Sequence, residues 1–155
     1  MTVGAEEIKT FRCKMRVLER EISKALAETT ACCGVTLSQC HTLLELEQQG
    51  SVSMKTLTKD LDIDKSTLSR IIDGLVNLGF LNRETDPGDR RRMNVCLTQN
   101  GHQVARRLNT TSDEYYTELF KHIPSGKHEQ VVESFVLLTE AMWAIRKGMK
   151  DEQKT

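Results

Sequence analysis

Apolar residues recur at helical spacing near both ends of this chain. Their intervals of three and four residues predict one apolar side on a long helix in each region. The first stripe consists of Ile8, Phe11, Met15, Leu18, Ile22 and Leu26, and the second of Val131, Phe135, Leu138, Met142, Ile145 and Met149. Both stripes are longer than a compact middle region can cover. We expect these helices to pack against each other or across a two-fold axis, with packing inside one chain as the alternative.

The segment after the first stripe begins with helix-ending and helix-starting signals. Gly34 is placed to end the first helix, and Thr36 and Gln39 have the spacing of a capping box for the next one. Gly50 ends that second helix. Residues 51–53 are short and suit a small strand.

Two closely spaced helices follow. Residues 54–61 predict a short helix, and Asp64 is placed to cap a longer one that ends before Gly79. Residues 62–64 between them form a tight turn of the length found in a helix-turn-helix.

A β-hairpin is predicted next. Residues 80–84 alternate weakly, as an exposed strand does. The returning strand has one buried face formed by Met93, Val95 and Leu97. Residues 86–89 read Asp-Pro-Gly-Asp and predict the turn between the strands, because Pro fixes φ and Gly88 permits positive φ.

The remaining pattern completes the fold prediction. Thr98 is placed to cap a fifth helix, and residues 124–126 break the chain before the last one. We expect a single domain, mainly α with a small β-hairpin, of the winged helix-turn-helix class. Residues 36–98 would form the winged-helix lobe, with residues 1–34 and 99–150 as dimerisation helices.

Composition and charge exclude several classes of protein. No stretch approaches the roughly 20 apolar residues of a membrane span, and the first residues lack the apolar core of a secretory signal, so we expect a cytoplasmic protein. No glycine-rich phosphate loop, Gly-x-Ser-x-Gly or His-Glu-x-x-His motif is present, which argues against an enzyme. The chain carries 22 basic and 22 acidic residues. Balanced charge leaves room for a local basic surface and predicts modest non-specific DNA affinity.

The helix after Asp64 is suited to the major groove of DNA, where the second helix of a helix-turn-helix lies. Small hydroxyl side chains near its start let the backbone approach phosphates, and the helix dipole favours an anion there. Arg70 has the reach to bind guanine O6 and N7, or to pair with a nearby acid. The expected DNA contacts on this helix are Lys65, Ser66, Thr67, Ser69 and Arg70.

The predicted hairpin supplies a second expected contact. Arg90, Arg91 and Arg92 lie just past its tip, and arginine inserted into a narrow minor groove senses the width and potential of that groove. Asp86 and Asp89 are placed to shape the tip. We expect Asp89, Arg90 and Arg91 to belong to the DNA site. The alternatives are a solvated surface, or a winged helix that binds protein. The second alternative predicts apolar or acidic residues on the exposed face of the helix after Asp64, where this chain has hydroxyls and bases.

Five stretches of the chain resemble the MarR family of bacterial and archaeal regulators. They are residues 57–61, 66–75, 78–81, 86–91 and 97–101, which read LTKDL, STLSRIIDGL, LGFL, DPGDRR and LTQNG. The resemblance implies a homodimer clasped by the first, fifth and sixth helices, binding a pseudo-palindromic operator in double-stranded DNA. It implies that Arg91 enters the minor groove, oriented by Asp89, and that repression is the usual outcome.

The five cysteines have no disulfide-framework spacing. Cys32, Cys33 and Cys40 lie on either side of Gly34, and His41 adjoins Cys40. If these side chains converge, three thiols suit zinc, copper(I) or arsenite as an effector, and an exposed thiolate suits an oxidant. The alternative is that Cys40, on the apolar face of its helix, is simply a small hydrophobic residue.

Other signals stay open. The zinc-responsive branch of the MarR family uses histidines in the fifth helix, and residues 112–116 contain none, which weakens the case for zinc. Cys13 and Cys96 have no paired partner in the sequence. A small aromatic or phenolic ligand between the dimer helices and the wing lobe is a further possible effector.

Overall fold

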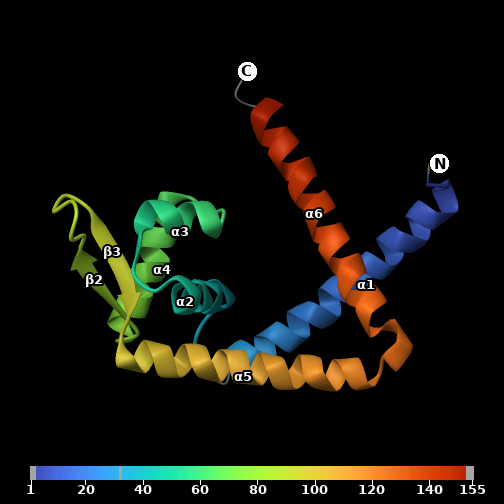
Figure 1. The fold of residues 1–155 in the computed structure, drawn as a ribbon, viewed down its shortest axis with the longest axis horizontal. Coiled ribbons are helices and arrows are strands. Elements are labelled where there is room, and N and C mark those ends of the chain that lie inside the picture. The colour runs from blue at the N-terminus through green and yellow to red at the C-terminus, as the bar shows by residue number, and fades with distance from the viewer. Residues whose placement is uncertain (1–2, 32, 153–155) are drawn as a thin grey trace. The chain divides into compact units, whose positions relative to one another are not determined.

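The structure is a computed structural model that describes residues 3–31 and 33–152 (Figure 1). The elements of this part of the chain, in order, are α1 (Ala5–Ala31), α2 (Leu37–Gln49), β1 (Val52–Ser53), α3 (Met54–Asp60), α4 (Lys65–Asn77), β2 (Leu81–Thr85), β3 (Met93–Leu97), α5 (Gln99–Lys121), a short 3-10 helix (Ser125–Lys127) and α6 (His128–Glu152). The prediction of a mainly helical winged helix-turn-helix fold with a small β-structure is confirmed. The chain divides between residues 112 and 113 into two compact units. None of the described helices is long and apolar enough to cross a membrane.

The predicted helix caps are present. Gln39 donates its backbone N–H to the Thr36 hydroxyl over 3.3 Å, and the Gln39 side chain accepts from the Thr36 backbone over 2.9 Å. Asp64 accepts from the Thr67 backbone over 2.9 Å and caps α4. Gly79 follows α4 with a φ of 74°, in the left-handed region that glycine adopts without strain. Local sequence signals therefore set where α2 and α4 begin and where α4 ends.

The sheet has three strands rather than the two of the predicted hairpin. Its order is β1-β3-β2, and all pairs are antiparallel. The small strand predicted at residues 51–53 is β1, and it adds to the far side of β3 with Val52 opposite Val95. This pairing attaches the segment before α3 to the hairpin. The strand that leads into the helix-turn-helix and the two strands of the wing therefore belong to one sheet.

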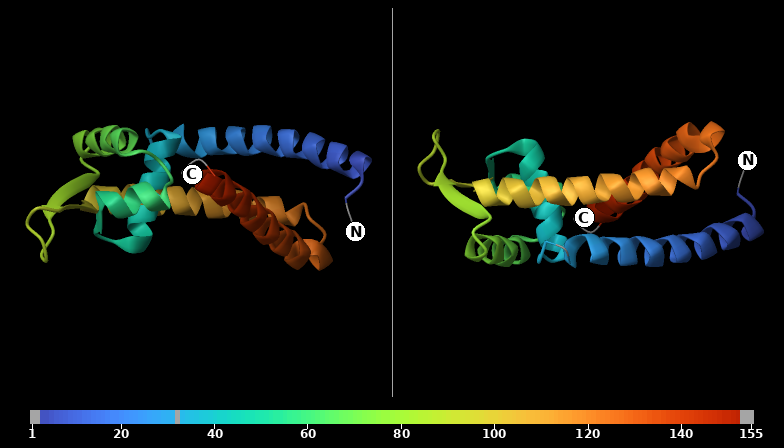
Figure 2. Two further views of the ribbon diagram at one scale, coloured as in Figure 1. Left: turned by 90° about the horizontal axis from the view of Figure 1, so that it is seen from above. Right: turned by 90° about the horizontal axis from the view of Figure 1, so that it is seen from below.

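One prediction about β3 is wrong. Val95 and Leu97 face the core as expected, but Met93 is 45% exposed. Met93 pairs with Thr85 at the end of the strand that leads into the β2–β3 loop. That loop projects beyond the helices of its lobe in both views of Figure 2. The alternation of apolar and polar residues in β3 extends beyond the part of the sheet that the helices cover. The side chain of Met93 therefore faces solvent.

The core of the lobe is built from aliphatic side chains of α2, α3, α4, the sheet and the first half of α5. Its largest fully buried members include Leu43, Leu46, Leu57, Leu68, Ile72, Leu75, Leu81, Val95 and Leu108. Side chains of this kind stabilise a domain by roughly 1.5–3 kcal/mol each when fully buried. The elements that present α4 and the wing are therefore anchored in a common core.

The start of α5 is fixed against the turn between α4 and β2. The Thr98 hydroxyl donates to the Gly79 carbonyl over 2.7 Å and accepts from the Gly101 backbone over 3.0 Å. The Thr98 backbone donates to the Phe80 carbonyl over 2.9 Å. Gly101 is buried, and a Cβ on it would lie 2.0 Å from the Phe80 carbonyl oxygen. Thr98 caps α5 as predicted, and Gly101 permits the close approach.

Gly101→Ala should destabilise the protein by about 2 kcal/mol or more, because its methyl group would overlap a backbone oxygen that has little room to move. Urea unfolding followed by circular dichroism measures this. Gly126→Ala is the control, since a Cβ there meets nothing within 4 Å. Equal stability of the two variants would show that the backbone relaxes at this junction.

The cap of α4 should make stability depend on pH in a defined direction. Hydrogen bonds from Ser66 and Thr67 hold the pKa of the Asp64 carboxyl well below its ordinary value of 3.8. A group with a lowered pKa in the folded state contributes stability above its unfolded pKa and loses it as the pH falls. Asp64→Asn keeps a capping oxygen but cannot titrate. Stability should therefore fall less steeply for this variant than for the parent between about pH 5 and pH 2.

Urea midpoints measured across this range test the prediction. Asp113→Asn, which replaces an exposed aspartate on α5, is the matched control. Curves for the Asp64 variant and the parent that run parallel would contradict this role of the Asp64 hydrogen bonds.

Candidate nucleic-acid interface

Helices α3 and α4 form the predicted helix-turn-helix. Residues 61–64 connect them, and Asp62 takes a φ of 51° within this turn. Leu57 of α3 and Leu68 and Ile72 of α4 are fully buried in the lobe core. The packing of these side chains fixes the two helices against each other, and one side of α4 is left free to meet a ligand.

The outward side of α4 carries the side chains expected from the sequence. Lys65, Ser66, Thr67 and Arg70 are exposed, and Ser69 is half-buried. Neither Lys65 nor Arg70 forms an ion pair with any described residue. Asp73, the acidic residue of α4, is bound to Arg83 of β2. The structure thus places the predicted residues in the first two turns of α4, with all but Ser69 exposed. The sequence analysis left open that Arg70 pairs with a nearby acid, and the structure shows no such ion pair.

The first turn of α4 differs from the expected anion-binding arrangement in one respect. The Thr67 hydroxyl donates to the Asp64 carboxylate over 2.6 Å, and the Ser66 hydroxyl donates to the same group. Asp64 is exposed, so its negative charge lies where a phosphate was expected to approach. Both hydroxyls would have to leave Asp64 before they could donate to a phosphate.

The ion pair between Asp73 and Arg83 joins α4 directly to the wing. Asp73 lies on the exposed side of α4, and Arg83 lies in the middle of β2, opposite Val95 of β3. The sequence did not single out this pair. Asp73 was expected on a helix and Arg83 on a strand, but neither pattern names a partner. The one signal for the ion pair is that the two residues lie ten positions apart, on either side of the turn at Gly79.

The wing loop is built differently from the predicted turn. Residues 86–89 are not the tight turn, and Gly88 does not have positive φ. The tight turn is Asp89–Arg92, closed by a 2.8 Å bond from the Arg92 N–H to the Asp89 carbonyl. The Asp86 carboxylate, and not a positive φ at Gly88, fixes the backbone of this loop. It accepts from the backbones of Gly88 and Asp89 over 2.8 and 2.9 Å, and from the Asn94 amide over 3.0 Å.

This arrangement also places the arginines differently. Arg90 and Arg91 occupy the turn itself, whereas the sequence analysis placed them just past it. The Asp89 carboxylate accepts from the backbone of Arg91 over 3.0 Å, and its other oxygen lies 3.3 Å from Nε of Arg92. Asp89 therefore holds the backbone at Arg91 and pairs with Arg92. The side chains of Arg90 and Arg91 are exposed and make no ion pair within the described chain.

A second basic feature lies beside the helix-turn-helix. Lys55 and Lys59 of α3 and Lys65 of α4 line an open hollow of about 650 Å³. The sequence analysis missed the two lysines of α3, although their spacing of four residues on a predicted helix was a readable signal. Basic side chains thus extend from α4 onto α3.

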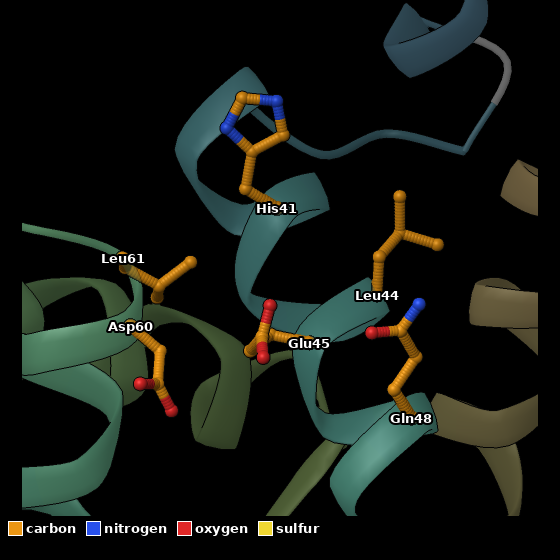
Figure 3. Close-up of a pocket in the computed structure, with 6 residues that line it drawn as sticks. All are labelled: His41, Leu44, Glu45, Gln48, Asp60 and Leu61. Atoms are coloured by element: carbon orange, nitrogen blue, oxygen red, sulfur yellow. The ribbon is translucent and has the colours of Figure 1, made fainter. Parts of the chain in front are cut away.

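The expected sensor residues do not all lie together. Cys40 is 3% exposed within the lobe core, and Cys33 is half-buried against the same core cluster. His41 is exposed and is one of the residues that line a hollow of about 330 Å³, together with Glu45 and Asp60 (Figure 3). Consecutive helix positions project about 100° apart, so Cys40 and His41 serve different surroundings.

The remaining cysteine positions add little to a sensor. Cys32 lies outside the described residues, and within the described ranges no three His, Cys, Asp or Glu side chains are grouped to hold a metal ion. Cys13 is exposed on α1. Burial, followed by the nearby Glu84, raises the pKa of the Cys96 thiol. Cys96 is therefore a weak nucleophile at neutral pH.

Comparison with known sequences agrees with this geometry. The model of the MarR family matches residues 35–93, which run from α2 through the helix-turn-helix to the end of the wing loop. An HTH-type transcriptional regulator of Mycobacterium leprae is 26% identical over 95 residues, which is 61% of this chain and 66% of that protein. The multiple antibiotic resistance protein MarR of Salmonella typhimurium is 27% identical over 94 residues, which is 60% of this chain and 65% of that protein. The chain thus spans just under two thirds of the length of these curated relatives.

Solved structures resemble the fold of most of the chain. A MarR transcriptional regulator from Methanosarcina mazei covers 88% of this chain and 99% of its own, with a TM-score of 0.74 and 23% identity. The apo form of MarR from E. coli covers 91% of this chain and 98% of its own, with a TM-score of 0.67 and 20% identity. The relatives and the solved structures agree with the family match over residues 35–93: the chain is similar to members of the MarR family.

Proposed function

We propose that this protein is a DNA-binding transcription regulator that reads double-stranded operator DNA with α4 and the wing loop. Members of the MarR family are transcription regulators and not enzymes. The observation that carries the proposal is the distribution of unpaired cations in the lobe. Lys65 and Arg70 on α4, and Arg90 and Arg91 in the wing, are exposed without an ion-pair partner in the described chain.

The paired arginines make this distribution informative. Arg83 is bound to Asp73 and Arg92 to Asp89, so these two cations hold the wing in place. An exposed ion pair contributes little electrostatic field, whereas an unpaired guanidinium attracts a phosphate or the negative potential of a narrow minor groove. The chain has no excess of positive charge overall. Its attraction to DNA would therefore come from this one surface.

Exposed apolar side chains on the long helices support the proposed homodimer. On α6 the stripe predicted from the sequence is largely exposed in the single chain, at Phe135, Met142, Ile145 and Met149. A second group on α6, formed by Val132, Val136 and Trp143, is exposed as well, with Trp143 at 67%. Apolar surface of this extent favours a partner, and a second copy related by two-fold symmetry presents the same surface.

Such a dimer would place two copies of α4 about 34 Å apart, the separation of successive major grooves. A pseudo-palindromic operator would then meet the same residues in both half-sites. Repression is the proposed outcome, because the resemblance to the MarR family implies it. A signal would act by shifting the population between dimers whose two α4 helices match this spacing and dimers whose helices do not.

Arg91→Ala should weaken DNA binding by about 1–3 kcal/mol, roughly 5- to 150-fold, because the variant loses an unpaired cation from the wing. Duplexes selected by the parent protein from a random pool supply the ligand. Affinities are measured by fluorescence anisotropy at one fixed salt concentration. Sedimentation should give the same oligomeric state for the parent and the variant.

Arg107→Ala, which removes an exposed unpaired arginine from α5, is the matched control. Unchanged affinity in Arg91→Ala, or an equal loss in both variants, would contradict the role of the wing. If the parent enriches no duplex from the pool, the chain is not a sequence-specific DNA-binding protein. The alternative of a winged helix that binds protein then takes its place.

Release by a thiol-reactive species or a soft metal ion is the favoured signal in this proposal. The supporting observation is that Cys33 and Cys40 belong to the same core cluster as the leucines that hold α4. Oxidation or metal binding at a buried thiol adds volume and polarity to a close-packed core, and such changes cost stability. A change at Cys40 would therefore reach the DNA-binding face through packing. The competing effector is a small aromatic ligand.

Replacement of Cys32, Cys33 and Cys40 by serine should abolish release of DNA by peroxide, arsenite, copper(I) or zinc. In the reduced, metal-free parent, one of these agents is expected to lower operator affinity at least tenfold, about 1.4 kcal/mol of coupling. Cys13→Ser is the control for reactions at exposed thiols. Because serine at the buried position 40 disturbs packing, Cys40→Ala is measured in parallel. Release that persists in the triple variant would place the sensor elsewhere.

A further inference from the structure

Two rows of like charge lie on the long helices, one on α1 and one on α6. Every member of both rows is exposed. None of these side chains forms an ion pair or a hydrogen bond with a described residue. The arginine row of α1 is Arg12, Arg16 and Arg20, and the glutamate row of α6 is Glu129, Glu133 and Glu140.

Other charged residues of α1 are arranged differently. Lys9 and Lys24, beyond either end of the arginine row, are each paired with a glutamate three residues before them. Glu19 lies three residues after Arg16, at a spacing that permits a pair, but no pair forms. The charge of the arginine row is therefore not neutralised within its own helix.

Helical periodicity places both rows away from the apolar stripes of these helices. With about 100° between consecutive residues, the arginine row is centred roughly 110° around α1 from its apolar stripe. The glutamate row is centred roughly 180° around α6 from the stripe of that helix, and the second apolar group of α6 lies between them. The proposed dimer, which uses the apolar side chains, does not require either row.

Each row has one exposed apolar side chain beside it that belongs to neither stripe. Val17, three residues before Arg20, is 40% exposed, and Leu137, four residues after Glu133, is 61% exposed. Arginine beside apolar surface is typical of contacts between proteins, whereas a nucleic-acid backbone presents mainly phosphates. The surroundings of the rows therefore favour a protein as the partner.

The two rows are complementary to each other. The planar guanidinium of arginine binds a carboxylate through two parallel hydrogen bonds. One helical turn, about 6 Å, separates successive arginines and also separates Glu129 from Glu133, so two helices lying side by side bring these groups into register. Glu140 lies about 10 Å further along α6, and the length of an arginine side chain covers the difference in spacing.

We propose that the arginine row of one dimer binds the glutamate row of a second dimer, so that the protein forms assemblies larger than a dimer. The inference rests on the homodimer of the proposed function. Because the two rows are different surfaces, the contact is head-to-tail and leaves further rows free for a third dimer. Exposed ion pairs over so small a surface give weak association in free solution.

DNA would strengthen this contact. Two dimers bound to neighbouring operator sites on one duplex are held at a high effective concentration, so a weak contact between them becomes significant. The rows would then make occupation of neighbouring sites cooperative without any further contact to the DNA.

Sedimentation velocity over a range of protein concentrations tests the inference at about 0.05 M and about 1 M salt, because screening weakens exposed ion pairs at the higher concentration. The α1 variant reverses the arginine row, the α6 variant reverses the glutamate row, and the swap variant carries both changes. The substitutions are Arg12→Glu, Arg16→Glu and Arg20→Glu on α1, and Glu129→Arg, Glu133→Arg and Glu140→Arg on α6.

The parent and the swap variant should form species larger than a dimer at low salt and dimers at high salt. The α1 and α6 variants should associate roughly tenfold or more weakly than the parent, because like charges then face each other. The matched control is Lys55→Glu, Lys59→Glu, Lys65→Glu, which reverses three exposed lysines of α3 and α4. It changes the net charge as the α1 variant does, and it should associate like the parent.

Several outcomes would overturn the inference. A parent that stays a dimer at low salt lacks the contact, and an equal loss in the control would show that net charge governs association. A swap variant that does not regain the larger species would show that the rows do not pair with each other. Dissociation of the α1 and α6 variants to monomers would place the rows inside the dimer.

Two results separate the remaining alternatives. If the α1 variant keeps its assembly but loses affinity for a mixed-sequence duplex, nucleic acid is the occupant of the arginine row and the inference fails. A parent that is a monomer at both salt concentrations would instead overturn the homodimer of the proposed function.

Discussion

The approach of α5 to the carbonyl of Phe80 determines how the winged-helix lobe is held together. At this point the end of α4, the start of β2 and the end of β3 meet the first turn of a long helix. Thr98 serves as a cap for α5 and as a donor to the Gly79 carbonyl, and Gly101 leaves the space that a side chain would fill. A movement of α5 would be transmitted directly to both α4 and the wing. The junction is therefore the mechanical link between the helix that extends out of the lobe and the surface proposed to read DNA.

Charge within the lobe is divided between structural and outward roles. Arg83 and Arg92 hold the wing to α4 and to its own loop. Lys65, Arg70, Arg90 and Arg91 are left without ion-pair partners in the described chain. A protein with no net charge can thus carry a strongly directional field, because its acids neutralise the cations that build the frame and leave the others unpaired.

The sequence predicted best those features that depend on neighbouring residues. The capping box at Thr36, the cap at Asp64 and the glycine after α4 follow from interactions within four residues, and all are present. The pairing of β1 with β3, the exposure of Met93 and the bond from Asp73 to Arg83 depend on how distant segments meet, and the sequence pattern did not specify them. The site residues on α4 were expected near its N-terminus or opposite its buried side, and helical periodicity is enough to predict this. The lysines of α3 join them only through the tertiary packing of the two helices.

The wing loop has a consequence for how this protein can change. Its backbone shape is supported by two carboxylates. Asp86 binds the loop backbone and the amide of Asn94, and Asp89 binds the backbone of Arg91. The side chains at positions 90 and 91 take no part in that shape. The residues that shape the wing and the residues proposed to contact DNA are therefore separable. Under that proposal, substitutions at the tip would alter which groove geometries are preferred without a new loop having to fold. Divergent regulators could retain the same wing and acquire different DNA preferences by changing two exposed positions.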